Sequence, residues 1–269
     1  AEDGYLTATR LRDVYRVDDA CGGVEIETEV LEGSPVRSGG CRPAALGWKR
    51  GGVMATLLLR LAAPLQSWGA DSKFEIRKTN REPTKSGVIG LLAAALGLAR
   101  DDGQALQRLN GLRFAVRVDQ EGQLLRDYHT ANNPTPDQVW EARRRGKAPH
   151  APYVTKRYYL ADAIFLVGLE SEDEALLQQL QQALAHPVYP LFLGRRSCPP
   201  TLPLCLGIRT AGLLDALETE PSQAPAWRRH PLAETRILAD ATPFQPGAVP
   251  RQDLPISFSP IHRQFGYRP

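Results

Sequence analysis

The chain is poor in the residues that build metal centres and disulfide frameworks. It holds only four cysteines and five histidines among its 269 residues. The cysteines, at positions 21, 41, 198 and 205, are widely spaced and form no Cys-x-x-Cys pair. Neither a zinc site nor a disulfide scaffold is therefore indicated, and we expect reduced thiols. We predict that the protein uses no metal and no other cofactor.

Long apolar runs are also missing. The longest candidate, VIGLLAAALGLA at residues 88–99, has the length of a buried helix rather than of a membrane span. The first residues show no apolar segment after a basic patch, so they do not resemble a signal peptide. Hydrophobic residues nevertheless make up 42% of the chain, which is enough for a substantial core. We therefore expect a globular, cytoplasmic protein without a membrane partner.

Methionine occurs once, at Met54, and the character of the sequence changes there. A glycine-rich stretch of weak periodicity precedes it, and the apolar segment ATLLLRLAAPLQSW follows it. We predict that residues 1–53 are upstream sequence read in frame or a fused tail, with a true N-terminal extension as the alternative. The functional domain is then expected to begin at residue 54.

The net charge of +3 is spread unevenly. Residues 1–53 carry seven basic and nine acidic residues, whereas residues 54–269 carry 26 and 21. Segment 73–86 holds five basic and two acidic residues, and segment 141–157 holds six basic residues and one acidic residue. Such local clusters can bind phosphate oxygens while the overall charge stays modest, although a solvated surface is the simpler interpretation.

The pattern after Met54 predicts a mixed α+β domain. Residues 56–62 form a continuous apolar run typical of a buried strand, and Pro83, Thr84 and Ser86 indicate a helix that ends near Gly97. Residues 112–119 alternate like a half-buried strand, and we expect residues 124–130 to return antiparallel to it as a hairpin.

Residues 131–152 interrupt this pattern with prolines and a basic run, as a functional or disordered excursion does. A further strand is expected at 157–170, followed by a helix at 171–186 with a capping box of Ser171 and Glu174. The order of strand, helix, strand, strand, helix and strand is that of a split βαβ, ferredoxin-like domain. After about residue 210 we expect a short helix at 213–218 and a tail that wraps the domain or contacts a partner.

The segment FLGRRSCPP contains a candidate phosphate grip. Gly194 would let an RNA backbone approach closely, and Arg195 and Arg196 offer planar forks for phosphate contact or for stacking on a base. The alternative is that Arg195 pairs with a carboxylate and Gly194 merely turns the chain. A second candidate is PTKSGVIG, where Lys85, Ser86 and Gly87 lie at a helix N-terminus that could bind an anion or be an ordinary cap.

The segment LRDYHT allows several roles. Arg126 could meet a phosphate, Tyr128 could stack on a base, and His129 could be a core residue or a general acid or base. Trp68 is expected to be a buried anchor rather than a stacking platform. Trp140 and the cations at 143–147 combine an aromatic ring with positive charge, which suits RNA or a solvated loop equally.

Six ordered blocks give the sequence a resemblance to a known family. They are LRLAAPLQSWG (59–69), REPTKSGVIGLLAAALGLARDD (81–102), LRFAVRVD (112–119), LRDYHT (125–130), TKRYYLADAIF (155–165) and LFLGRRSCPPTLPLCLG (191–207). Together they resemble the CasD subunits of type I-E Cascade, in the Cas-five branch of the repeat-associated mysterious proteins (RAMP) of CRISPR systems. The resemblance begins at Met54 and ends near Gly207.

The resemblance implies a fold, a function and partners. The expected fold is an α+β, ferredoxin-like (RRM-related) RAMP domain at 54–210, with a protruding thumb insertion at about 131–157 and a small C-terminal extension at 211–269. The expected function is non-catalytic binding of the crRNA 5′ handle in antiviral defence. The expected protein partners are the CasC backbone subunit, the large subunit CasA and other Cascade subunits, while target DNA is contacted only indirectly.

The candidate RNA-binding residues follow from these motifs and basic clusters: Lys78, Arg81, Lys85, Ser86, Gly87, Arg126, Tyr128, Arg144, Arg145, Lys156, Arg157, Gly194, Arg195 and Arg196. The alternative function is a metal-independent endoribonuclease that processes CRISPR repeat RNA, as in type I-C systems. Such an enzyme needs a base near the 2′-hydroxyl and a cation near the phosphate. The catalytic candidates would be His129, Tyr128, Lys156 and Tyr158.

Overall fold

The fold is taken from a computed structural model of the chain. It describes residues 11–17, 24–30, 54–69, 75–131, 134–147, 153–228, 235–241, 247–259 and 261–268. The chain divides into two compact units, Ala1–Arg50 and Gly51–Pro269. In the first unit, strands β1 (Leu11–Val17) and β2 (Val24–Val30) pair antiparallel over their whole length.

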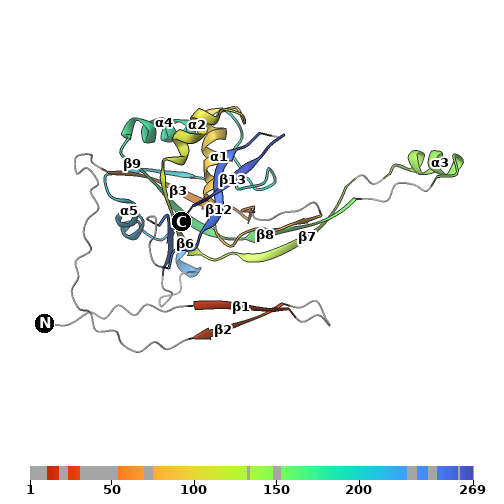
Figure 1. The fold of residues 1–269 in the computed structure, drawn as a ribbon, viewed down its shortest axis with the longest axis horizontal. Coiled ribbons are helices and arrows are strands. Elements are labelled where there is room, and N and C mark those ends of the chain that lie inside the picture. Colours follow the sequence, from red (N-terminus) through yellow and green to blue (C-terminus); the bar gives the residue numbers. More distant parts are fainter. Residues whose placement is uncertain are drawn as a thin grey trace. The chain divides into compact units, whose positions relative to one another are not determined.

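A five-stranded antiparallel sheet organises the second unit (Figure 1). Its order is β10 (Cys205–Arg209), β3 (Ala55–Ala62), β9 (Ile164–Ser171), β6 (Arg113–Gln120) and β11 (Arg236–Ala239). The apolar run at 56–62 becomes β3, where the strand is buried on both faces, as its unbroken hydrophobicity predicts. The expected mixed α+β class is confirmed.

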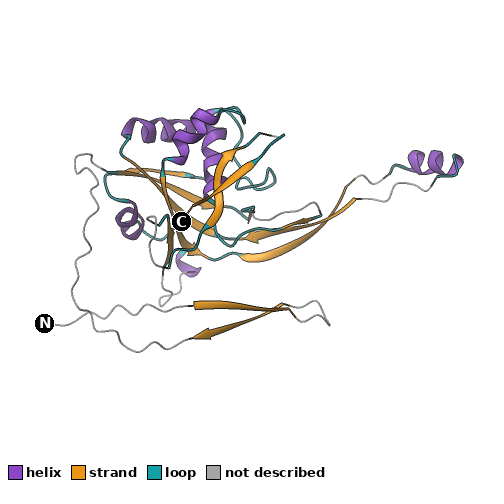
Figure 2. Cartoon of the chain, in the orientation of Figure 1, coloured by secondary structure: helices purple, strands orange, loops and turns teal. Residues whose placement is uncertain are grey.

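Helices cover both faces of this sheet unequally (Figure 2). Helices α1 (Lys85–Leu96), α2 (Gly103–Asn110) and α4 (Glu174–Ala185) bury the main core against one face, with Leu57, Leu59 and Leu61 pointing toward them. Helix α5 (Leu213–Thr219) covers a smaller area of the other face, over Leu58 and Leu166. The helix expected at 213–218 is therefore confirmed. No described helix has the length and apolar character needed to cross a membrane.

The capping residues predicted from the sequence are found at both ends of α1 but not at the start of α4. Helix α1 begins after Thr84, whose Oγ1 accepts from the backbone N of Gly87, and ends at Gly97 with φ of 74°. These ends are as expected. Helix α4, however, is capped by Asp173, whose carboxylate accepts from the backbone N of Leu176 at 2.9 Å. Ser171 instead accepts from the backbone N of Asp173, so the capping box assigned to Ser171 is wrong.

The strands around the excursion pair differently from our expectation. Strand β6 pairs with β9 and β11, whereas β7 (Gln123–Ala131) pairs with β8 (Tyr153–Ala161) over nine residues. The predicted hairpin of 112–119 with 124–130 is therefore wrong. The predicted strand 157–170 is also two strands, β8 and β9, separated at Asp162, which has φ of 58°.

Strands β7 and β8 form a ribbon that projects from the five-stranded sheet (Figure 1). Short strands β4 (Leu65–Gln66) and β5 (Ile76–Arg77) pair with β8 and join the ribbon to the body. Helix α3 (Pro136–Arg144) lies between β7 and β8 in the chain and begins with a capping box of Thr135 and Gln138. The excursion thus includes both ribbon strands and is longer than the insertion predicted at 131–157.

The C-terminal segment belongs to the body. Strand β11 extends the sheet beside β6, and the hairpin of β12 (Arg251–Ser257) and β13 (Gln264–Arg268) packs against α1 and α2. A single turn of 3-10 helix, η1 (Ala226–Arg228), follows α5. The tail therefore wraps the domain, which was one of the two alternatives predicted for it.

A buried ion pair fastens α5 to the sheet. Arg117 and Asp119 have side chains only 4% and 1% exposed, and Nε of Arg117 lies 2.6 Å from Oδ1 of Asp119. The Arg117 guanidinium also donates to the carbonyls of Leu217, Glu220 and Pro221 at the end of α5. The single guanidinium of Arg117 thereby donates both to carbonyl groups at the end of α5 and to the Asp119 carboxylate on β6.

The substitution Arg117→Met should lower the free energy of unfolding of the larger unit by about 3–5 kcal/mol, because it leaves the buried Asp119 carboxylate without its cation. The matched control is Arg108→Met, which removes the pair of Arg108 with Asp173, whose side chains are 53% and 46% exposed. That loss should be much smaller, because the pair is exposed to solvent. Urea unfolding of both variants measures the difference, and equal losses would contradict the assigned role of Arg117.

Candidate nucleic-acid interface

The ribbon separates its side chains onto two faces. Residues directly opposite one another in an antiparallel pair share a face, and neighbours along a strand alternate. Tyr128 lies opposite Lys156, and Arg126 lies opposite Tyr158. These four residues, here called the ribbon cluster, therefore share one face. Tyr128 is 66% exposed and Lys156 and Arg126 are also exposed, so this face combines cations with accessible aromatic rings.

His129 lies on the other face of the ribbon. It is opposite Thr155, which is buried and donates from its hydroxyl to the carbonyl of His129. The four residues considered for catalysis are thus divided: His129 is on one face, and Tyr128, Lys156 and Tyr158 are on the other. A base and a cation must act on adjacent atoms of one nucleotide, and this arrangement does not bring them together.

A second group of cations forms where the FLGRRSCPP segment meets the ribbon. The Arg195 guanidinium lies over the Tyr159 ring, with Cζ 4.6 Å from its centroid, and Nη2 donates to the carbonyl of Arg77 at 2.9 Å. Arg77 in turn lies opposite Arg157 in the pairing of β5 with β8. We call Arg77, Arg157, Tyr159, Arg195 and Arg196 the loop cluster.

The loop cluster has the electrostatics of an anion site. Three arginines converge on one patch, and Arg196 beside them is exposed. Nη1 of Arg195 is buried and has no hydrogen-bond partner among the described residues. Because Nη1 is not accessible, a phosphate oxygen could approach only the accessible part of Arg195 and the exposed Arg196. Arg195 contacts a ring and a carbonyl, rather than the carboxylate considered as an alternative.

Gly194 has a packing role beside the RNA approach that we predict for it, and it is exposed. Its φ is 86°, and a Cβ at this position would lie 1.6 Å from the carbonyl oxygen of Ser67. The backbone N of Ser67 donates to the carbonyl of Leu193 at 3.2 Å, which holds the loop against this segment. The glycine is therefore required to seat the arginines beside the ribbon.

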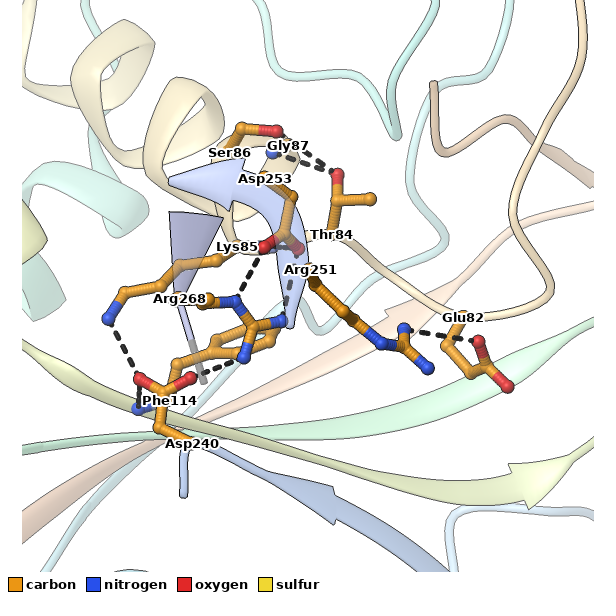
Figure 3. A network of polar contacts seen from close by, with 10 residues as sticks. All are labelled: Glu82, Thr84, Lys85, Ser86, Gly87, Phe114, Asp240, Arg251, Asp253 and Arg268. Atoms are coloured by element: carbon orange, nitrogen blue, oxygen red, sulfur yellow. Dashed lines mark hydrogen bonds and ion pairs between the residues drawn. The ribbon is translucent and has the colours of Figure 1, made fainter. Parts of the chain in front are cut away.

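The N-terminus of α1 is occupied by the protein's own residues, which corrects the prediction of an anion site there (Figure 3). Oδ2 of Asp253 accepts from the backbone N of Lys85 at 2.9 Å, and Nζ of Lys85 lies 2.8 Å from Asp240. Ser86 points its hydroxyl at Thr84, and a Cβ on Gly87 would lie 2.9 Å from the Trp68 ring. Lys85 is only 5% exposed, so its ammonium is not available to RNA.

Arg268 completes this internal network (Figure 3). Its guanidinium pairs with Asp253 at 2.6 Å and also with Asp240, and it stacks on Phe114. Burial disfavours the charged guanidinium, but hydrogen bonds and ion pairs with Asp253 and Asp240 outweigh that cost and raise the pKa of Arg268. The network joins the last strand to the first helix of the body.

The remaining predicted residues are placed as follows. Lys78 and Arg81 are exposed in the loop between β5 and α1, next to the loop cluster residue Arg77 in sequence. Arg144 lies over the Trp140 ring at 5.4 Å, and Arg145 pairs with Glu141 on α3. Trp68 is fully buried and donates from Nε1 to Gln66, so its predicted role as an anchor is confirmed.

Sequence reasoning missed Arg77 and Tyr159 as members of the site. Arg77 belongs to a strand of only two residues, and Tyr159 lies within a run of apolar and aromatic residues that reads as core. The one available signal was that Arg77 falls within the basic segment 73–86. The pairing of β5 with β8 places Arg77 opposite Arg157. That pairing joins residues far apart in the sequence, so no local pattern predicts it.

Comparisons with known proteins now define the class. Residues 56–269 match the family model described as "CRISPR-associated protein (Cas_Cas5)", and the chain belongs to this family. The match extends through the C-terminal segment, beyond the sequence blocks that end at residue 207. This agrees with the packing of β11, β12 and β13 onto the body.

Individual relatives point in the same direction. The chain is 43% identical over 162 residues to "CRISPR system Cascade subunit CasD" of Escherichia coli (strain K12), covering 56% of this chain and 70% of the relative. A solved chain titled "CRISPR RNA-guided surveillance complex" matches with a TM-score of 0.62 and 33% identity, over 79% of this chain and 87% of that one. A second, "Crystal structure of Cas protein", matches with a TM-score of 0.59 and 37% identity, over 79% and 91%.

The packing role of Gly194 can be tested by Gly194→Ala. The new Cβ would meet the Ser67 carbonyl, so the loop would have to move. The free energy of unfolding should therefore fall by more than the roughly 1 kcal/mol that a left-handed backbone conformation alone costs. Gly207→Ala is the control, since Gly207 has φ of 95° but its nearest neighbour is the flexible end of Arg209 at 3.5 Å. Urea unfolding reports both, and a smaller loss for Gly194→Ala would refute the packing role.

Proposed function

We propose that this chain is the CasD subunit of a type I-E Cascade surveillance complex and that it holds the 5′ handle of crRNA without cutting it. The family match and the 43% identity to the Escherichia coli CasD support the assignment to Cascade. We also propose that the body is a ferredoxin-like RAMP domain. The strand order β10-β3-β9-β6, with α1 and α4 on one face, supports that assignment.

The observation that carries handle binding is the loop cluster. Arg77, Arg157 and Arg195 gather around Tyr159, and Arg196 beside them is exposed. Phosphates of single-stranded RNA would neutralise these cations, while exposed rings such as Tyr128 in the ribbon cluster would stack on splayed bases. Lys78 and Arg81 would extend the same positive surface.

The ribbon and α3 fit the role of a thumb. We propose that they contact the CasC backbone subunit, and that other surfaces of the body meet CasA and the remaining Cascade subunits. Arg144 and Arg145 on α3 would then lie near the RNA where it passes from one subunit to the next. Target DNA would be contacted indirectly, through its pairing with the guide.

The endoribonuclease alternative is less well supported. His129 lies on the opposite ribbon face from Tyr128, Lys156 and Tyr158, so the proposed base is separated from the proposed cation. The handle-binding role requires no proton transfer, because charge neutralisation and stacking suffice for binding. We therefore propose a non-catalytic subunit that needs neither metal nor cofactor.

Handle affinity should fall with salt, with a slope of log K against log salt of about −0.7 for each neutralised phosphate and roughly −3 for four phosphates. The double substitution Arg195→Ala with Arg196→Ala should weaken binding and reduce the magnitude of this slope by about 1.4. Arg100→Ala with Arg108→Ala removes the same charge from the α2 region and should leave the slope unchanged. Fluorescence anisotropy with labelled handle RNA measures both, and identical slopes in all three proteins would exclude the loop cluster as the grip.

The non-catalytic role predicts that end-labelled CRISPR repeat RNA stays intact when incubated with the full chain in EDTA, while a native gel shows a handle-dependent shift. Denaturing gels at several times provide the measurement. His129→Ala is the informative variant, because cleavage by the wild type that disappears in this variant would place the protein among the endoribonucleases.

A further inference from the structure

Two basic loops are fixed to the same short segment of the chain, the neighbouring residues Ser67 and Trp68. In the FLGRRSCPP segment, the carbonyl of Leu193 accepts from the backbone N of Ser67 at 3.2 Å. In residues 77–81, here called the basic loop, the backbone N of Asn80 donates to the carbonyl of Trp68 at 2.7 Å. Ser67 and Trp68 are both buried. The interior of the body therefore determines how far apart the two loops lie.

The charges of the two loops oppose this arrangement. The basic loop carries Arg77, Lys78 and Arg81 and has no acidic residue. The FLGRRSCPP segment carries Arg195 and Arg196 and also has none. Cations brought together repel one another until an anion neutralises them. Hydrogen bonds therefore have to hold the loops in place in the free protein, and one of them runs from Nη2 of Arg195 to the carbonyl of Arg77.

The hydroxyl of Thr79 makes a further link, which is inserted into the pairing of Trp68 with Asn80. These two residues form an antiparallel bridge. The backbone N of Trp68 donates to Oγ1 of Thr79 at 2.7 Å, and this hydroxyl donates to the carbonyl of Asn80 at 3.0 Å. The hydroxyl thus relays a hydrogen bond across the bridge and sets the spacing there. Without it, the buried N–H of Trp68 would lose this acceptor, and the basic loop would have to shift to replace it.

We infer that Thr79 is a positioning residue for RNA binding. Its hydroxyl holds Arg77 and Arg81 at a fixed spacing from Arg195 and Arg196, so that a single strand meets both loops without first ordering them. Ordering that is complete before binding does not reduce affinity. The inference rests on the proposed function, because the spacing matters only if the loop cluster holds RNA. A purely structural hydrogen bond would stabilise the fold and leave the RNA affinity of the folded protein unchanged.

The test uses the full chain and labelled handle RNA, with affinity measured by fluorescence anisotropy. Thr79→Val removes the hydroxyl at nearly constant volume and should weaken binding about 10-fold or more, the effect of losing one charge-assisted contact. The slope of log K against log salt should fall in magnitude by about 0.7 for each phosphate contact that is lost. Thr79→Ser keeps the hydroxyl and should retain the wild-type affinity and slope.

Thr56→Val is the matched control. Thr56 is buried on β3, and its hydroxyl donates to the carbonyl of Ala211 at 2.9 Å, so the substitution removes a comparable bond outside both basic loops. The free energy of unfolding should fall, while the RNA affinity of the folded protein should equal that of the wild type. Urea unfolding establishes that each variant is folded, and Thr79→Ala takes the place of Thr79→Val if the valine variant is not.

A second measurement tests whether Thr79 acts through the cations of the basic loop. The double substitution Arg77→Ala with Arg81→Ala removes two of them. Adding Thr79→Val to this double variant should then weaken binding by less than about twofold, because residues that act through one another are not additive. Additive losses would show that Thr79 affects RNA by another route and would overturn the inference.

The outcomes separate this inference from the proposed function. If Arg195→Ala with Arg196→Ala weakens handle binding but Thr79→Val binds with wild-type affinity and slope, the loop cluster holds RNA and the positioning role is refuted. A loss in Thr79→Ser as large as that in Thr79→Val would also refute it, since the hydroxyl would not be the cause. If the wild type does not bind handle RNA at all, both proposals fail together.

Discussion

The body depends on two carboxylates, the buried Asp253 and the partly buried Asp240, which connect the end of the chain to its first helix. Asp253 accepts from the N-terminus of α1, Asp240 pairs with Lys85, and Arg268 bridges the two acids. Charges removed from water must be compensated inside the protein, so each member of this network requires the others. The C-terminal strands are for this reason part of the domain, and they close over α1 rather than extending away from it.

This network also determines where an anion can bind. A helix N-terminus is generally a favourable site for phosphate, but here Asp253 already occupies it. Exposed cations such as Lys156 and Arg196 lie on the ribbon and on the loop beside it. Gly194 and the Ser67 carbonyl hold that loop in position, and Arg195 bridges it to Tyr159 and Arg77. The positive surface is thus a consequence of how the loop packs, as much as of its arginines.

The two faces of the five-stranded sheet have different consequences for function. One face is filled by α1, α2 and α4 and forms the main core. On the other face, Arg117 ties α5 to β6, and a cavity among the described residues lies beside Gln120 and Trp227. The ribbon carries cations on both of its faces, with Lys156 on one and Arg157 on the other.

The sequence by itself determined the α+β class, β3, both ends of α1, α5, the buried anchor Trp68 and the family. These rest on local signals, such as the unbroken apolar run of β3 or the Thr84 and Gly97 caps, that need only near neighbours in the chain. Tertiary structure alone decided that β7 pairs with β8, that Tyr128 lies opposite Lys156, and that Lys85 is internal. Each of those depends on partners far away in sequence: Asp253 is 168 residues from Lys85. No local pattern distinguishes a lysine at a helix start that binds phosphate from one that a distant carboxylate has already neutralised.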